Sequence, residues 1–336
     1  MRVSIHDLVT ANENERVEDA FLRTKNLVKT AESLGYHRYW FSEHHSIEAN
    51  LSTSPEILIA YFISQTSKIR LGSGGTMIMH YSPLKVAENF KTLIALAKNR
   101  IDIGLGRAPG GDAKSIIALS EGKGVSVDDL YQKIEYILSY FKDEEIRDRR
   151  YKAKAIPNNT SFLPSPWMLG SSGNSANFAA YMGLGYSHAK FFSVDVADVV
   201  FSEYKRNFRP SVFFEKPELM FSYMVVVADS KEEANYLAKP IEMMFLSIAR
   251  GTKQLKILNP EKVKDYKFSQ DEENLIKSKY EKRYFIKGDK QSVSEILHDE
   301  AKKYSLDEIM VYSPIYSPEK REDSYRKIAE IFDIKP

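Results

Sequence analysis

A glutamate and two histidines stand together just after an apolar run in this sequence. Glu43, His44 and His45 follow the stretch YWFS, in a chain that contains only seven histidines. An imidazole titrates close to neutral pH, and a neighbouring carboxylate can fix its tautomer, so this pattern suits proton transfer. A metal site and a histidine bonded to backbone at a strand end are the other interpretations.

The spacing argues against the metal site. Adjacent residues of a strand point to opposite faces, so Glu43 and His45 could share one side while His44 faces the other. Two neighbouring histidines make a poor chelate, and no histidine pair four residues apart on a helix completes a ligand set. We therefore expect no metal, and both the proton-transfer role and the structural role stay open.

Three glycines occur within the four residues Gly72–Gly75, at the end of another β-rich run. Glycine weakens a strand, so this placement indicates either a bulge or a close approach to the backbone. A flat ligand stacked over the peptide plane would need bare backbone of this kind. An ordinary glycine-rich turn is the alternative.

Two further segments have groups that could bind an anion. Arg107 follows the run IDIGLG, and its planar guanidinium suits phosphate or carboxylate, although a surface ion pair would explain it as well. The segment Ser171–Ser175 leads from a strand into a helix, which places free N–H groups, the helix dipole and hydroxyls around one point. N-capping by serine is the simpler explanation, but with Arg107 the segment would hold a phosphate.

The glycines around Arg107 do not form a dinucleotide-binding fingerprint. In the pattern G-x-G-x-x-G, Pro109 occupies the position of the third glycine, and Gly110 arrives one residue late. We therefore expect no nicotinamide site in this segment.

These segments require a fold that brings distant strand ends together. β-rich runs alternate with helix-like segments, which is typical of parallel strands joined by crossover helices. Eight such pairs favour a single (β/α)8 TIM barrel over residues 1–336, with a doubly wound sheet plus a second domain as the alternative. We expect excursions at about 142–166 and 251–284. In a barrel, all strands end on one face, where the candidate segments would converge.

The helical segments can be placed from their periodicity and their terminal residues. Gly35 is expected to cap the first helix, and Pro240 to kink or restart the helix that contains it. The expected helices that matter below cover about residues 16–34, 127–141, 174–182, 195–206 and 229–249.

Composition excludes several classes of function. Lysine plus arginine (48) nearly cancels aspartate plus glutamate (46), and no basic run is interleaved with aromatics, so we expect a small-molecule partner and no nucleic acid. The absence of cysteine excludes disulfides and thiolate chemistry and fits a reducing compartment. No run of about 18 apolar residues occurs. We therefore expect no membrane span, no signal peptide and a cytoplasmic location.

With these residues identified, the chain resembles the bacterial luciferase-like flavin monooxygenases, and most closely their single-chain, non-luminescent branch. The resemblance runs nearly end to end, through GYHRYWFSEHH, RLGSGGTMIMHYSPLKVAENF, RIDIGLGRAPGG, LGSSGNSANFAAYMGLGY and DEIMVYSPIY. It implies a (β/α)8 barrel that binds FMN, commonly in the reduced form delivered by a separate flavin reductase, and uses molecular oxygen to oxidise a small organic substrate. It also implies a homodimer.

The resemblance assigns roles by position. His44 matches the catalytic histidine, with Glu43 before it, and Arg107 matches the arginine of the flavin phosphate. Gly74 and Gly75, followed by Thr76, match a non-proline cis peptide beneath the isoalloxazine ring. The phosphate loop matches Ser171, Ser172, Gly173 and Ser175.

Two departures from luciferase bear on function. Gly106 stands where luciferase has a reactive cysteine, and the long mobile lid of luciferase has no clear counterpart. We therefore predict no light emission. Three alternatives remain open: a deazaflavin-dependent hydride-transfer enzyme of the same fold, a non-catalytic flavin-binding protein, and a metal-dependent barrel hydrolase that uses Glu43, His44 and His45.

Overall fold

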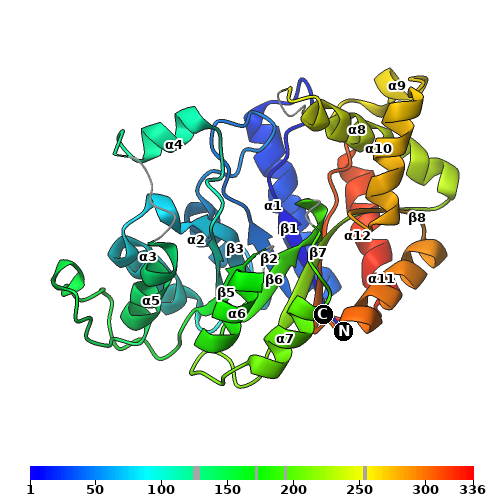
Figure 1. The fold of residues 1–336 in the computed structure, drawn as a ribbon. Helices are drawn as coiled ribbons and strands as arrows, with labels where there is room; N and C mark the ends of the chain where they lie inside the picture. The colour runs from blue at the N-terminus through cyan, green and yellow to red at the C-terminus, as the bar shows by residue number, and fades with distance from the viewer. Residues whose placement is uncertain (124–128, 171–172, 193–194, 253–255) are drawn as a thin grey trace.

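Parallel strands close into a barrel in the structure, a computed structural model that describes residues 1–123, 129–170, 173–192, 195–252 and 256–336 (Figure 1). Strands β1 to β7 pair in chain order, and β9 pairs with both β7 and β1, which closes the ring. The predicted (β/α)8 barrel is confirmed. Its strands are β1 (Arg2–Asp7), β2 (Arg38–Phe41), β3 (Arg70–Met77), β4 (Ile101–Gly106), β5 (Ser165–Leu169), β6 (Gly185–Ala189), β7 (Leu219–Ala228) and β9 (Glu308–Tyr312).

Helices surround the strands (Figure 1). Within the described ranges, no helix is both long enough and apolar enough to span a membrane. The helices are α1 (Val17–Leu34), α2 (Pro55–Ile63), α3 (Pro83–Ala97), α4 (Ala113–Leu119), α5 (Leu130–Phe141), α6 (Gly173–Met182), α7 (Val199–Asn207), α8 (Lys231–Ala249), α9 (Pro260–Val263), α10 (Gln270–Glu281), α11 (Lys290–Tyr304) and α12 (Pro318–Ile331), with 3-10 turns at Ile78–His80, Arg149–Tyr151 and Lys190–Phe192.

The sequence did not indicate strand β8 (Phe285–Asp289) or the helices α4 and α11. Strand β7 is long enough to have two successive neighbours on one edge. Its first half pairs with β6, and the part from Met224 to Ala228 pairs with β8. The excursion at 251–284 contains α9 and α10 and leads into this extra strand, while the excursion at 142–166 holds one 3-10 turn.

One predicted helix start is displaced. Helix α7 begins at Val199 rather than Asp195, whose carboxylate pairs with Lys282, at 2.5 Å, from the segment after α10. Helix α5 is described from Leu130, and its predicted start at Val127 lies outside the described residues.

The first helix ends as predicted, at Gly35, whose backbone is left-handed with φ +87°. The prediction of a new start at Pro240 is wrong, because α8 continues through this residue. Residues on both sides of the proline, including Ala238 and Ile241, are buried against the end of β7 and β8. The packing of this face therefore keeps α8 a single helix, although Pro240 lacks the N–H group that would donate to the preceding turn.

Alternate strand residues face the barrel interior. Val3 and Ile5 of β1 pack outward against the helices, so Ser4 and His6 point inward. Across the middle of the interior lies a separate apolar layer, whose members come from β2, β5, β7 and β9: Trp40, Trp167, Met220 and Met310.

A buried ionic cluster fills the interior at the amino ends of the strands. The Arg38 guanidinium on β2 donates to Asp102 of β4 at 2.9 Å and to both oxygens of Glu308 of β9 at 2.8 and 3.0 Å. It also lies 4.7 Å from the centre of the Trp167 ring. Arg38 is 3% exposed and both carboxylate residues are 0% exposed. This cluster joins strands from both halves of the chain.

Arg38→Met should therefore destabilise the protein strongly. Without the Arg38 guanidinium, Asp102 and Glu308 keep only Arg70 and the more distant Arg2 as counter-charges. Loss of one member of a buried ion pair costs about 3–5 kcal/mol. Urea denaturation of the purified protein measures this loss. The matched control is Arg16→Met, which removes a surface pair with Asp19 and should change stability by less than about 1 kcal/mol. Equal losses in the two variants would contradict a structural role for the cluster.

Candidate active site

Three candidate segments follow the carboxyl ends of β2, β4 and β5, and the glycine segment Gly72–Gly75 lies within β3; these four strands are neighbours in the barrel. This end of the barrel is the one that carries α4 and α9 in Figure 1. Hydrogen bonds join three of the segments directly. The His45 N–H donates to the Gly110 carbonyl at 2.7 Å, and the Met77 N–H donates to Glu43 Oε2 at 2.8 Å. These three segments therefore meet at one mouth, as predicted.

Glu43 is the centre of a hydrogen-bond network at the mouth. Its buried carboxylate accepts from His45 Nε2 at 2.8 Å and from the Tyr81 hydroxyl at 2.6 Å, besides the Met77 N–H. Burial and the Glu43 charge raise the pKa of Tyr81, so its hydroxyl stays protonated and donates. Glu43 and His45 thus share one side, as the strand alternation indicated, and the carboxylate orients His45 rather than His44.

His44 is half-buried, and its backbone N–H donates to the Ser52 carbonyl at 2.9 Å. Its buried Nδ1 has no hydrogen-bond partner among the described residues. Burial, followed by the nearby charges of His6 and His45, lowers the pKa of His44 to about 4. The imidazole is therefore neutral at neutral pH and has a nitrogen available to a ligand.

His6 is a site residue that the sequence analysis missed. It lies on the inward face of β1, where its Nε2 is 2.8 Å from Ser42 Oγ, and it hydrogen-bonds to the backbone of Gly74. Burial lowers the pKa of His6 to about 4. The available signal was the alternation in RVSIHD, which puts His6 on the polar face with Ser4.

The peptide bond between Gly74 and Gly75 is cis, as the family resemblance implied. A β-carbon on Gly74 would lie 3.0 Å from both His6 Nε2 and an atom of the Trp40 ring, and one on Gly75 would lie 2.4 Å from a methyl group of Leu169. Both interpretations of these glycines are confirmed, because the pairing of β3 with β4 shifts register between Ser73 and Thr76, and protein side chains approach this backbone closely. Thr76 follows, buried, with its hydroxyl 2.9 Å from Ser73 Oγ.

The anion-binding candidates lie at the ends of β4 and β5, which pair with each other. Arg107 is exposed and forms no ion pair within the described part of the chain. Gly173 opens α6, and Ser175 is buried with its Oγ 3.3 Å from the Tyr186 hydroxyl. The predicted residues Ser171 and Ser172 lie outside the described residues. Arg107 is thus free to pair with an anion near the start of α6.

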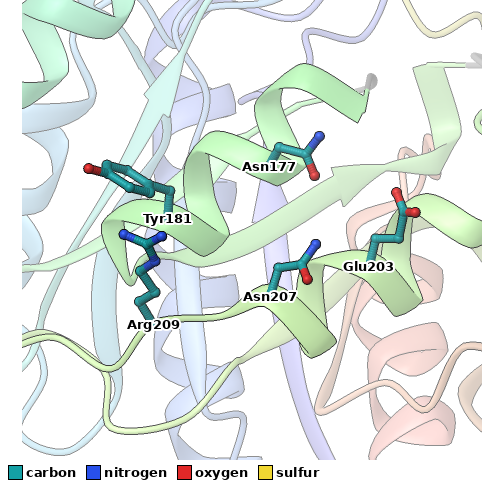
Figure 2. A pocket seen from close by; sticks show the side chains of 5 residues that line it. All are labelled: Asn177, Tyr181, Glu203, Asn207 and Arg209. Carbon is teal, nitrogen blue, oxygen red and sulfur yellow. The ribbon is translucent and has the colours of Figure 1, made fainter.

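A hollow of about 350 Å³ lies outside the barrel between α6 and α7 (Figure 2). The Arg209 guanidinium lies 4.3 Å from the centre of the Tyr181 ring there. The hollow contains none of the predicted site residues, and its lining residues are exposed except for the half-buried Glu203. Its lining residues are Asn177, Tyr181, Glu203, Asn207 and Arg209.

The segment after β1 connects the mouth to the later excursion. Ile257 donates to the Ala11 carbonyl at 3.0 Å and accepts from the Glu13 N–H at 2.9 Å. Thr10 pairs with Asn50 of the segment after β2. The part of the 251–284 excursion that begins at residue 256 is therefore anchored next to the candidate site.

The family model described as luciferase-like monooxygenase matches residues 1–302 of this chain. The chain belongs to this family. A luciferase-like monooxygenase of Escherichia coli (strain K12) is 33% identical over 329 residues, which cover 98% of this chain and 96% of that protein. Membership in the luciferase-like monooxygenase family makes the chain an oxidoreductase, as predicted.

Two solved structures agree with the fold. The crystal structure of apo-MsnO8 has a TM-score of 0.91 and 30% identity, covering 100% of this chain and 99% of that one. The oxygenating constituent of 3,6-diketocamphane monooxygenase from Pseudomonas putida, solved in complex with FMN, has a TM-score of 0.71 and 17% identity, covering 98% and 97%. At that identity, the second match bears on the fold alone.

Because burial lowers the pKa values of these histidines, the stability of this luciferase-like monooxygenase should depend on pH. Below an ordinary histidine pKa of 6.5, the unfolded chain binds protons that folded His6 and His44 do not bind until about pH 4. Stability should therefore fall as the pH is lowered from 6.5 towards 4. His37 and His188 contribute in the same direction, because burial lowers their pKa values to about 4.

Replacing one histidine shows how much that residue contributes to the change of stability with pH. His6→Phe should reduce the loss of unfolding free energy by up to about 1.4 kcal/mol per pH unit, measured by urea denaturation at several pH values between 4 and 7. The control is His298→Gln, at an exposed position on α11. A slope in His6→Phe that equals that of the wild type would show that His6 does not titrate as described.

Proposed function

We propose that this enzyme is an FMN-dependent monooxygenase that uses reduced FMN and molecular oxygen to oxidise a small organic substrate. The observation that supports this most is the composition of the mouth. Around the mouth lie the cis peptide Gly74–Gly75 and the neutral imidazoles of His6 and His44, whose Nδ1 atoms have no partner among the described residues. The Arg107 guanidinium forms no ion pair within the same part of the chain. When bound, reduced flavin supplies the electrons that activate oxygen, which is chemistry that amino-acid side chains lack.

Arg107 and the start of α6 would hold the phosphate of FMN. The guanidinium gives charge-assisted hydrogen bonds, and the helix start gives N–H donors and a positive dipole end. Ser171, Ser172, Gly173 and Ser175 belong to this proposed phosphate loop. The peptide of Gly74 and Gly75, with Thr76 next to it, would support the ring system.

His44 would hold or transfer a proton at its Nδ1. The imidazole is neutral at working pH and this nitrogen has no protein partner among the described residues, so it can exchange a proton with a bound molecule. Glu43 acts indirectly in this proposal. Its carboxylate is occupied by His45, Tyr81 and the Met77 backbone, so it positions the loop that carries His44.

The proposal includes partners. Because the sequence shows no nicotinamide motif, a separate flavin reductase would deliver the reduced FMN. We also retain the homodimer implied by the family resemblance, and the cytoplasmic location that the cysteine-free composition favours.

Rapid mixing tests the function. Protein loaded with reduced FMN is mixed with oxygenated buffer at low temperature, and flavin absorbance is followed. We expect reoxidation to pass through an absorbing species that outlasts the reoxidation of free reduced FMN. Reoxidation at the rate of free flavin would contradict the oxygenase mechanism. Mass spectrometry of the ligand copurified with the protein separates FMN from the deazaflavin alternative.

Arg107→Ala should weaken FMN binding by about 1.5–3 kcal/mol, the value of a hydrogen bond to a charged group, and leave the fold intact. Fluorescence titration measures the dissociation constant, and circular dichroism checks the fold. Arg209→Ala is the matched control, because Arg209 is also an exposed arginine but lies in the outer hollow of Figure 2. Unchanged affinity in Arg107→Ala would refute the phosphate assignment.

His44→Ala should retain FMN but lower coupled substrate oxidation by about 100-fold or more, in line with the loss of a general acid or base. Product formed per oxygen consumed is the measurement, with exposed His298→Ala as the control. Full coupling in His44→Ala would remove this histidine from the mechanism.

A further inference from the structure

The protein uses only part of the hydrogen-bonding capacity of His6. The residue is 5% exposed and sits inside the barrel, with its ring edge-on to Phe191 at 5.6 Å between ring centres. Its Nε2 lies 2.8 Å from Ser42 Oγ and next to Gly74. Its Nδ1 is buried and has no hydrogen-bond partner among the described residues.

The contact with Ser42 assigns the tautomer of this imidazole. Ser42 Oγ lies 2.8 Å from Nε2 and can accept a hydrogen bond from it, whereas a hydrogen on Nδ1 would have no acceptor among the described residues. The nitrogen beside Gly74 is Nε2, which lies 3.0 Å from the position of a β-carbon there. Nε2 therefore carries the hydrogen, and Nδ1 is left as a bare lone pair.

The charged groups near His6 are engaged elsewhere. The Asp7 carboxylate pairs with Arg321 at 2.9 Å, and the Glu43 carboxylate serves the network at the mouth. The neighbouring titratable group is His44, which also has an unpartnered Nδ1. Native proteins rarely leave a buried acceptor unpaired, and such a group calls for an explanation.

We propose that His6 is a ligand-binding residue of the mouth: its Nδ1 accepts a hydrogen bond from an N–H or O–H group of a bound molecule, while its Nε2–H donates to Ser42 Oγ and holds the ring beside Gly74. This inference rests on the proposed function, which places a ligand on the Gly74–Gly75 peptide. The donor belongs either to an N–H of the flavin ring or to the substrate. Together, His6 and His44 favour a ligand edge that carries a hydrogen-bond donor over a purely hydrocarbon edge.

Nitrogen NMR of wild-type protein labelled with ¹⁵N-histidine tests this without turnover. We expect the ligand-free spectrum to show His6 as the Nε2–H tautomer, assigned by its loss in His6→Phe. Addition of FMN, or of hexan-1-ol to the FMN-loaded protein, should then shift the His6 Nδ1 resonance in the direction of an accepted hydrogen bond. The methyl ether of hexanol, which lacks the donor, should not shift it. A response to FMN assigns the donor to flavin, and a response to the alcohol alone assigns it to the substrate.

Two variants separate the two nitrogens. His6→Gln keeps a donor at the ε position but nothing at Nδ1, whereas His6→Asn keeps a polar group at the δ position only. If flavin supplies the donor, His6→Gln should weaken FMN binding by roughly three- to tenfold, the size of one hydrogen bond. If the substrate supplies it, the same variant should instead abolish the difference between hexan-1-ol and its ether in displacement titrations.

An Nδ1–H tautomer, or an Nδ1 resonance that responds to neither FMN nor the alcohol, overturns this inference. Such a result in a protein that still binds FMN leaves the proposed function standing. Failure of the wild type to bind FMN contradicts the proposed function instead. Addition of hexan-1-ol to the ligand-free protein then still tests whether His6 Nδ1 accepts a hydrogen bond.

Discussion

A single buried charge constrains how this barrel can close. The Arg38 guanidinium lies almost completely out of water, and such a charge is tolerated only when opposite charges surround it with good geometry. Its partners are Asp102 and Glu308, which are 206 residues apart in the chain (308 minus 102). Glu308 also accepts from Ser4 of the first strand. Compensation of this one charge therefore requires the first, second, fourth and last strands to meet in the observed order.

The interior of the barrel also affects the histidines at the mouth, at the opposite end from the ionic cluster. The apolar layer formed by Trp40, Trp167, Met220 and Met310 lies between the ionic cluster and the mouth. It keeps the charges of the cluster away from His6, so burial dominates the surroundings of that imidazole and the pKa falls. Neutral histidines at the mouth are thus a consequence of where the barrel places its counter-charges. Gly72 belongs to this arrangement, because a β-carbon there would lie 2.6 Å from Trp40 Nε1.

Much of the fold was predictable, because it follows from local signals. Alternating strands and helices predicted the barrel, and strand alternation alone predicted that Glu43 and His45 share a side. Strand β8 escaped notice because its sequence, FIKGD, has only two consecutive apolar residues. Its pairing depends on the unusual length of β7, which no local pattern reveals.

The site was predictable only in part, since its key properties depend on distant contacts. The Tyr81 hydroxyl reaches Glu43 from 38 residues away in the chain, and His6 meets Ser42 and Gly74 only once three strands are aligned. Which nitrogen of an imidazole lacks a partner is a property of the assembled neighbourhood. A sequence shows the histidine, but not the atoms around it.

The anchoring of the later excursion at Ile257 has an evolutionary consequence. The bonds to Ala11 and Glu13 involve only main-chain atoms, so the bonds themselves require no particular side chain, and only burial of Ile257 in the apolar cluster constrains that position. The stretch beyond this anchor, including α9 and α10, can accumulate substitutions while its entry point stays fixed beside the mouth. Sequence divergence in α9 and α10 would change which molecules reach the mouth, while the interior of the barrel stays the same.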